Sequence, residues 1–153
     1  MDNAEIREQV LHVIDLGKQI YIFSTVDAEN RPRSRYMGLI DIEDDYSAFY
    51  MGCKANSNKV KEIKANPNAQ LLFTTPDFLE IAAISGKASI EDSPHEKRQF
   101  WQKNPALAGY FKTMDDPEFA VIRVIPEFAE YYNVGNNFER CFIPWEPMAA
   151  RKE

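Results

Sequence analysis

The chain of 153 residues is poor in the side chains on which self-contained enzymes most often rely. It has two histidines, His12 and His95, which fall in separate predicted helices and cannot build a histidine-rich metal site. Its two cysteines, Cys53 and Cys141, lack the spacing of a zinc site or a disulfide framework. No Gly-x-Ser-x-Gly elbow occurs. These absences argue against a serine hydrolase, and they predict that no metal is bound.

Long apolar runs and an excess of positive charge are also missing. No stretch approaches the roughly 18 to 20 apolar residues that crossing a bilayer requires. The first ten residues are polar and mildly acidic, unlike a signal peptide. The net charge of −6 argues against a nucleic-acid partner, because such binding depends on neutralising phosphates. We therefore expect a soluble, cytoplasmic protein that binds neither nucleic acid nor membrane.

What the sequence does contain is enough apolar material for one packed core. Hydrophobic residues make up 44% of the chain and aromatic residues 12%. No linker, repeat or low-complexity tract divides it, so we expect a single domain over residues 1–153. Residues 134–153 show no clear periodicity and are expected to form an irregular C-terminal tail.

The periodicity predicts a mainly β protein with about three helices at its flanks. Helices are expected over residues 4–17, 57–65 and 94–103, the last beginning with the capping box Ser93-Pro94-His95-Glu96. Strands are expected over residues 19–26, 33–43, 48–52, 69–75 and 79–92. Residues 119–126 and 128–134 are either two further strands or one strand that is broken at Pro126. Gly86 is placed where a bulge would fit. Six to seven antiparallel strands without regular strand–helix alternation favour a closed or partly closed β-barrel over a doubly wound sheet.

The first segment with chemical potential is the loop and helix start that follow the strand over residues 48–52. Free N–H groups at a helix N-terminus favour a phosphate, Ser57 can donate its hydroxyl, and Lys59 adds a positive charge. The alternative is that Ser57 or Asn56 caps the helix while Lys59 is solvated.

The second segment is the predicted strand that begins at residue 33. Arg33 and Arg35 are two residues apart and share one face, with Ser34 on the other. Paired arginines can hold a phosphate or the oxygen-rich edge of a ring system, or they can simply face solvent. Residues 31–35 carry three cations and no acid, and residues 54–64 carry four cations and one acid. Such local basic charge in an acidic protein indicates a small anionic ligand, unless both are solvated faces.

The order of these segments resembles the pyridoxamine 5′-phosphate oxidase-like FMN-binding split barrels, especially the general stress protein branch. The resemblance covers residues 5–134. It rests on an N-terminal helix, the hairpin FSTVDAENRPRSRYMG, a Ser-x-Lys-Val helix that ends in Asn-Pro, the segment ISGKASIEDSP and the C-terminal RVIPEFAEYYN. It implies a split β-barrel that binds FMN in a homodimer.

The resemblance also implies which residues bind the cofactor. The backbone of the strand over residues 33–37 would run along the isoalloxazine ring, with the Arg35 side chain nearest its pyrimidine edge. The residues implied at the ring are Arg33, Ser34, Arg35, Tyr36 and Met37. Those implied at the phosphate are Gly52, Cys53, Ser57 and Lys59. Two positions depart from the family pattern: Cys53 stands where relatives often have threonine, and Asn58 where they often have a cation, a charge that Lys54 could replace.

Because no catalytic side chains of its own are evident, the chemistry is expected to come from the flavin. The expected function is that of an FMN-dependent oxidoreductase acting on an unidentified small molecule. Pyridoxamine phosphate itself is disfavoured, since a second set of phosphate-binding arginines is not found. Two alternatives are a flavin-binding storage or sensor protein without turnover, and a split barrel that uses deazaflavin or haem. Trp101 and Trp145 could stack near a ligand or fill a core or an interface.

Overall fold

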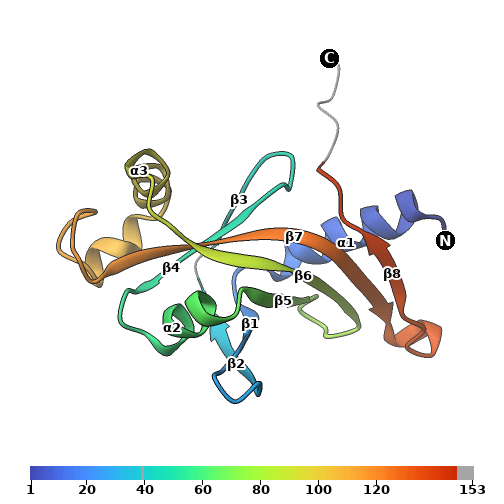
Figure 1. Cartoon of the computed structure of the whole chain (residues 1–153). Helices are drawn as coiled ribbons and strands as arrows, with labels where there is room; N and C mark the ends of the chain where they lie inside the picture. Colours follow the sequence, from blue (N-terminus) through green and yellow to red (C-terminus); the bar gives the residue numbers. More distant parts are fainter. Residues whose placement is uncertain (39, 148–153) are drawn as a thin grey trace.

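A computed structural model describes residues 1–38 and 40–147, which form one antiparallel sheet with three α-helices (Figure 1). The strands are β1 (Tyr21–Val26), β2 (Pro32–Met37), β3 (Asp41–Ile42), β4 (Phe49–Lys54), β5 (Asn68–Thr74), β6 (Glu80–Glu91), β7 (Phe119–Asn133) and β8 (Cys141–Pro144). The helices are α1 (Asn3–Gly17), α2 (Asn58–Ala65) and α3 (Pro94–Lys103), with the short 3-10 helices η1 (Pro105–Gly109) and η2 (Val134–Asn136).

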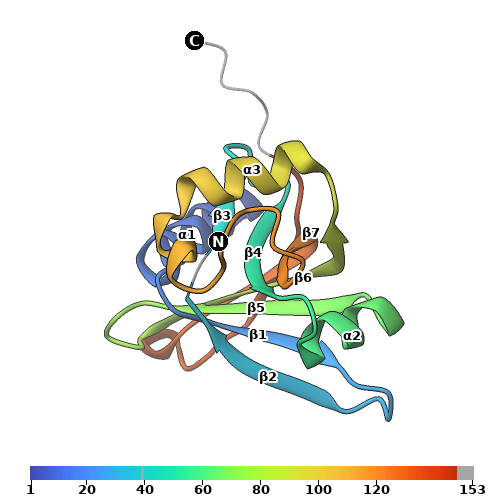
Figure 2. The same cartoon turned by 90° about the vertical axis from the view of Figure 1, so that its left-hand side faces the viewer.

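The sheet bends into a barrel that remains split. Its strand order is β2-β1-β5-β6-β7-β4-β3, with β8 added on β7. The end strands β2 and β3 do not pair with each other, so the barrel is open between β2 and the β3–β4 hairpin. Figure 2 shows β2, β1 and β5 on one side of this opening and β4 on the other. The expected split barrel is therefore confirmed, with eight strands in the described residues rather than six or seven.

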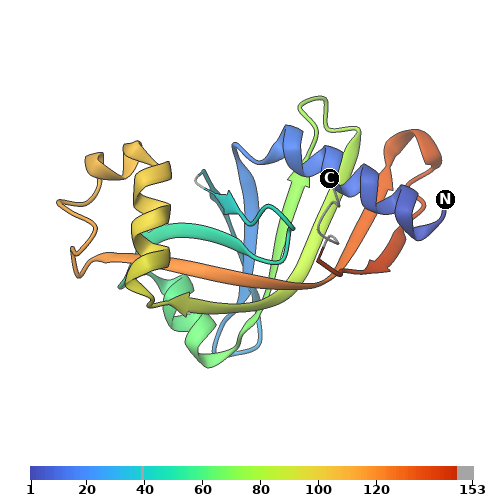
Figure 3. The same ribbon diagram turned by 90° about the horizontal axis from the view of Figure 1, so that it is seen from above.

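The inner face of the sheet forms the main core. Alternate residues of β1 and β5 point inward, among them Phe23, Leu71 and Phe73, all fully buried. Helix α1 packs on this face through four apolar residues at helical spacing, Ile6, Val10, Val13 and Ile14. Figure 3 shows α1 and α3 at opposite ends of the sheet.

A second, smaller cluster lies on the opposite face of β4 and β7. It joins Phe100 of α3 to Leu107 and Phe111 at η1, and these pack on Phe119 and Val121 of β7. Ser93 caps α3 by accepting a hydrogen bond from the Glu96 N–H, as the capping box predicts. This cluster fixes η1 against β4, beside the split.

Two predicted strands differ from the structure. The strand expected over residues 33–43 is divided, because β2 ends at Met37 and β3 pairs with β4 instead of β1. The break expected at Pro126 is absent, and β7 continues through it. Pro126 lies at the register shift between Ser85 and Gly86, which confirms the bulge expected at Gly86. A Cβ at Gly86 would lie 2.0 Å from the Ile125 carbonyl oxygen, so this close backbone approach requires glycine.

The expected irregular tail instead contains β8, which pairs with β7. Trp145 follows it and is 5% exposed; its Nε1–H donates to the Tyr46 carbonyl oxygen at 3.0 Å, and the Arg7 guanidinium stacks over its ring. Trp145 therefore fills the core. Trp101 packs edge-on against Phe119 in the second cluster. Residues 148–153 of the expected tail lie outside the described residues. Among the helices that the structure describes, none is long and apolar enough to cross a membrane.

Candidate functional site

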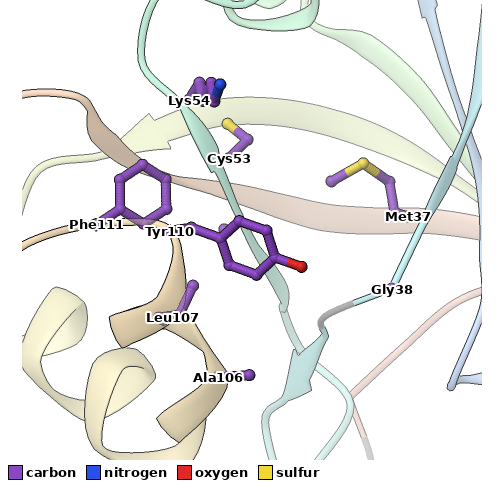
Figure 4. A pocket seen from close by; sticks show the side chains of 9 residues that line it. Met37, Gly38, Cys53, Lys54, Ala106, Leu107, Tyr110 and Phe111 are labelled. Atoms are coloured by element: carbon purple, nitrogen blue, oxygen red, sulfur yellow. The ribbon is translucent and has the colours of Figure 1, made fainter.

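A pocket of about 370 Å³ lies in the split of the barrel (Figure 4). Its walls come from the end of β2, the end of β4 and the segment around η1. The lining residues are Met37, Gly38, Gly52, Cys53, Lys54, Ala106, Leu107, Tyr110 and Phe111. Its volume lies in the range of small-molecule sites. Three of the residues predicted at the cofactor, Met37, Gly52 and Cys53, thus meet in one pocket although they come from opposite sides of the split.

The start of α2 adds two more predicted residues beside Cys53. Burial raises the pKa of the Cys53 thiol, while the charge of Lys59 and the hydroxyl of Ser57 act in the opposite direction. Both residues at the start of α2 are therefore near enough to the thiol to act on it. The thiol is buried and stays protonated at neutral pH, so it is no ready nucleophile.

Ser57 holds the N-cap position of α2 without capping it through its side chain. No hydrogen bond joins its hydroxyl to the first turn of the helix. Its Oγ is buried and, among the described residues, has no hydrogen-bond partner other than the neighbouring Cys53 thiol, which is a weak acceptor. The Ser57 side chain therefore does not cap the helix, and a buried hydroxyl without a strong partner costs up to about 1–3 kcal/mol. An acceptor supplied by a ligand would satisfy it.

The charges around the pocket favour an anion. Lys54 lines the pocket and is exposed, while Lys59 is half-buried at the first turn of α2. No carboxylate is among the described residues that line the pocket. The free N–H groups at the α2 N-terminus add positive potential on the same side. Within the described ranges, no group of three or more His, Cys, Asp or Glu side chains could hold a metal ion.

Strand β2 presents its predicted residues to two different faces. In the register with β1, Arg33, Arg35 and Met37 lie opposite the inward residues Thr25, Phe23 and Tyr21. Ser34 and Tyr36 therefore face outward, where the Ser34 and Ser24 hydroxyls are 2.8 Å apart and Tyr36 is 72% exposed. The structure thus does not bring the side chains of Ser34 and Tyr36 into the pocket. A backbone contact from this strand to a ring stays a prediction.

The Arg35 guanidinium is held inside the protein rather than in the pocket lining. Its Nη1–H donates to Thr25 Oγ1 at 2.8 Å and to the Phe23 carbonyl oxygen at 3.3 Å, and its Nη2 lies 3.6 Å from Glu62 Oε1. Thr25 also donates to Glu62 Oε2 at 2.9 Å. Burial lowers the pKa of Arg35, the Glu62 carboxylate raises it, and nearby Arg33 lowers it. Arg35 thus ties β2 and β1 to α2, and Glu62 is a partner that sequence reasoning missed.

Gly52 has a packing role in addition to lining the pocket. A Cβ at this position would lie 2.8 Å from Phe100 Cε1 and 3.4 Å from Leu107 Cδ2. The missing side chain therefore lets η1 pack directly on β4. The residues that η1 and the two positions after it contribute to the pocket were also missed. The aromatic pair Tyr110-Phe111 after Asn104-Pro105 is the one signal for them in the sequence.

Solved structures of low sequence identity share this fold. General stress protein 26 from Bacillus anthracis str. Sterne is 23% identical, with a TM-score of 0.73 over 92% of this chain and 99% of that one. A pyridoxamine 5′-phosphate oxidase-related, FMN binding protein from Nostoc punctiforme is 16% identical, with a TM-score of 0.65 over 96% and 100%. A heme binding protein from Mycobacterium smegmatis is 12% identical, with a TM-score of 0.70 over 94% and 59%.

The family follows from the sequence itself. A search of curated proteins found no significant match to the chain. The model of the pyridoxamine 5′-phosphate oxidase family matches residues 6–133, which include every strand that borders the split. The chain belongs to the pyridoxamine 5′-phosphate oxidase family of FMN-binding split barrels.

Proposed function

We propose that the pocket in the split holds FMN, with the phosphate at the N-terminus of α2. The observation that carries the proposal is the buried Ser57 Oγ, which has only the weakly accepting Cys53 thiol beside it, with the partly buried Lys59 two positions further along. A phosphate oxygen would accept the Ser57 hydroxyl hydrogen and pair with the lysine, which removes the cost of the orphaned group. The family and the FMN-binding relative from Nostoc punctiforme support the same cofactor.

The remaining residues divide into a phosphate end and a ring end. Lys54 and the free N–H groups of α2 add positive potential at the phosphate end. Cys53, which replaces a frequent threonine, contributes a thiol with weak hydrogen-bonding capacity. Asn58 is exposed and carries no charge to replace a cation there. Met37 and Leu107 give the ring end an apolar wall.

With FMN bound, the flavin supplies hydride or electron transfer, and we propose an oxidoreductase that acts on a small molecule. The protein binds the phosphate, positions the ring beside β2 and excludes water with the aliphatic side chains of η1. Electron transfer would then require a second small molecule in the same pocket. Turnover with NAD(P)H and an electron acceptor distinguishes this function from flavin storage.

Haem has less support in this structure than FMN. Both histidines are exposed, His12 on α1 and His95 on α3, and neither lines the pocket. A haem-binding member of the fold exists in Mycobacterium smegmatis, so the absorbance spectrum of the purified protein is the direct test. A flavin spectrum supports the proposal, and a Soret band contradicts it.

We further propose that a second copy of the chain completes the site. The outer face of β2, β1 and β5 carries the cross-strand row Tyr36, Ile22 and Leu72, in register from strand to strand. The buried side chains of α1 and α2 belong to the inner core, so neither helix packs its apolar face on this row. An exposed aromatic residue in an apolar row favours a protein partner. Light scattering of the FMN-loaded protein tests this, and a monomer contradicts it.

The phosphate site is tested by comparing FMN with riboflavin, which has the same ring and no phosphate. Lys59→Ala and Ser57→Ala should each weaken FMN binding about 10- to 100-fold, the equivalent of a hydrogen bond to a charged group. Riboflavin affinity should change little. Lys61→Ala is the matched control, because Lys61 is exposed on the same helix. An equal loss for both ligands would mean that Lys59 supports the fold and that the phosphate binds elsewhere.

A further inference from the structure

We infer that the η1 end of the pocket is a subsite for an uncharged, planar conjugated ring, and that Tyr110 packs against the face of that ring. The inference rests on the proposed function, because the ring belongs either to the flavin or to the substrate that meets it. It assigns a ligand-contacting role to a residue that lies outside the two segments implied in cofactor binding. If the ring is the substrate's, the inference also narrows the substrate class to uncharged, planar conjugated molecules.

Tyr110 combines a rigid backbone with a free ring. It is 73% exposed although it lines the pocket. Its N–H donates to the Leu107 carbonyl oxygen at 2.9 Å, and the N–H of Phe111 donates to the same oxygen at 2.9 Å. Leu107 and Phe111 are 1% and 6% exposed in the second cluster. The backbone is thus anchored on both sides, and the Tyr110 ring stands at the pocket with its surface available.

The groups around this ring suit a flat, uncharged ligand. Figure 4 shows Met37 on the far side of the pocket from η1, and the Tyr110 hydroxyl pointing toward that side. The thioether of Met37 is polarizable and packs well against aromatic rings. Gly52 lines the pocket with backbone alone, and the space beside its Cα is filled by the apolar side chains of Phe100 and Leu107.

Charge separates the two ends of the pocket. Figure 4 shows Lys54 and Ala106 at opposite ends, and the η1 end is formed by Ala106, Leu107 and Tyr110 without any charged side chain. A phosphate ester at this end would have no cation to pair with. A neutral ring would lose little hydration free energy on leaving water, so it fits this end better. An aromatic pair contributes roughly 2- to 12-fold in affinity beyond the area it buries.

The first experiment titrates the protein with FMN and with lumiflavin, the flavin ring without ribityl chain or phosphate. Tyr110→Leu removes the aromatic face and keeps an apolar side chain, whereas Tyr110→Phe keeps the ring. Phe78→Leu is the matched control, since Phe78 is 71% exposed in the turn before β6 and does not line the pocket. If Tyr110 contacts the flavin, Tyr110→Leu weakens the binding of both ligands by the same factor, roughly 2- to 12-fold, and the other two variants change neither affinity.

The second experiment tests a substrate ring. Menadione, an uncharged bicyclic quinone, is titrated onto the FMN-loaded proteins and followed by the change in flavin absorbance. If Tyr110 contacts the substrate, Tyr110→Leu weakens menadione binding by the same factor while flavin affinity is unchanged. Tyr110→Phe restores it. Either pattern supports the inference.

The remaining outcomes overturn either this inference or the proposed phosphate site, and they can be told apart. Unchanged affinities for FMN, lumiflavin and menadione in Tyr110→Leu refute the subsite and leave the proposed FMN site intact. A loss of dimer by light scattering with unchanged ring affinity assigns Tyr110 to an interface instead. If lumiflavin binds but Lys59→Ala leaves FMN unaffected, the phosphate proposal fails and the ring subsite stands. If the wild-type protein binds neither flavin, both proposals fail.

Discussion

Variants of Arg35 and Glu62 can show whether Arg35 contacts the cofactor directly or affects its binding by holding α2 in place. Arg35 and Glu62 side chains are 25% and 12% exposed, and both bond to the Thr25 hydroxyl, which is buried between them. We consider Arg35→Met and Glu62→Gln, singly and together. Methionine keeps most of the side-chain volume, and glutamine keeps the shape of glutamate while removing its charge.

The expected effect on stability follows from these contacts. Arg35→Met removes a charged hydrogen bond to Thr25 and leaves the mostly buried Glu62 without its cation. Such a bond contributes about 1.5–3 kcal/mol, and partial exposure of the guanidinium reduces this, so we expect a loss of about 1–2 kcal/mol. Because the two groups share one network, the double variant should lose less than the sum of the single losses, by about 0.5–1.5 kcal/mol.

Urea unfolding and FMN titration of the four proteins measure this cycle. If Arg35 acts through α2, both single variants weaken FMN binding by similar factors, and the double variant is no weaker than either. If Arg35 touches the flavin itself, Glu62→Gln should leave affinity unchanged or raise it, because a competing carboxylate is gone. Additive losses of stability would refute the network. Unchanged or higher FMN affinity in Glu62→Gln would instead support the direct contact between Arg35 and the flavin that the family resemblance implies.

Two further predictions concern residues of β4. Gly52→Ala should lower the free energy of unfolding by about 1–3 kcal/mol, because the added Cβ would overlap the Phe100 ring of α3. Gly109→Ala is the control: the space around this position is open, so the free energy of unfolding should change by less than about 0.5 kcal/mol in the same urea series. Burial raises the pKa of the Cys53 thiol, so iodoacetamide at pH 7.5 should alkylate the half-buried Cys141 before Cys53, as peptide mass analysis would show. Faster labelling of Cys53 would contradict its burial.

Helices could be predicted from the sequence where local residues mark their apolar face or their first turn. Helix α1 follows from four apolar residues at helical spacing, and α3 from the capping box at Ser93. The division between β2 and β3 could not be predicted, because alternation continues across residues 33–43 while the choice of partner strand depends on distant residues. Strand β8 is four residues long and ends in proline, so it lacks a periodic signature.

In the candidate site, too, contacts between residues distant in the sequence could not be predicted. Met37, Gly52 and Cys53 could be assigned to it because family resemblance places them beside the cofactor, and the structure brings them together. The opposite faces of Arg35 and Tyr36 were implicit in strand alternation, but the pairing of Arg35 with Glu62 was not. That pair joins β2 to a helix 27 positions further along the chain, which no local pattern encodes.

The contacts of Trp145 with Arg7 and Tyr46 have a consequence for how the protein folds. The Trp145 Nε1–H reaches a carbonyl oxygen 99 positions earlier, and Arg7 of α1 lies over the same indole. Segments at positions 7, 46 and 145 must therefore come together before these contacts can form. Long-range closure of this kind is slow, because loop entropy is lost before the contact forms. Until that closure, the indole of Trp145, which is 5% exposed in the folded protein, stays accessible to water.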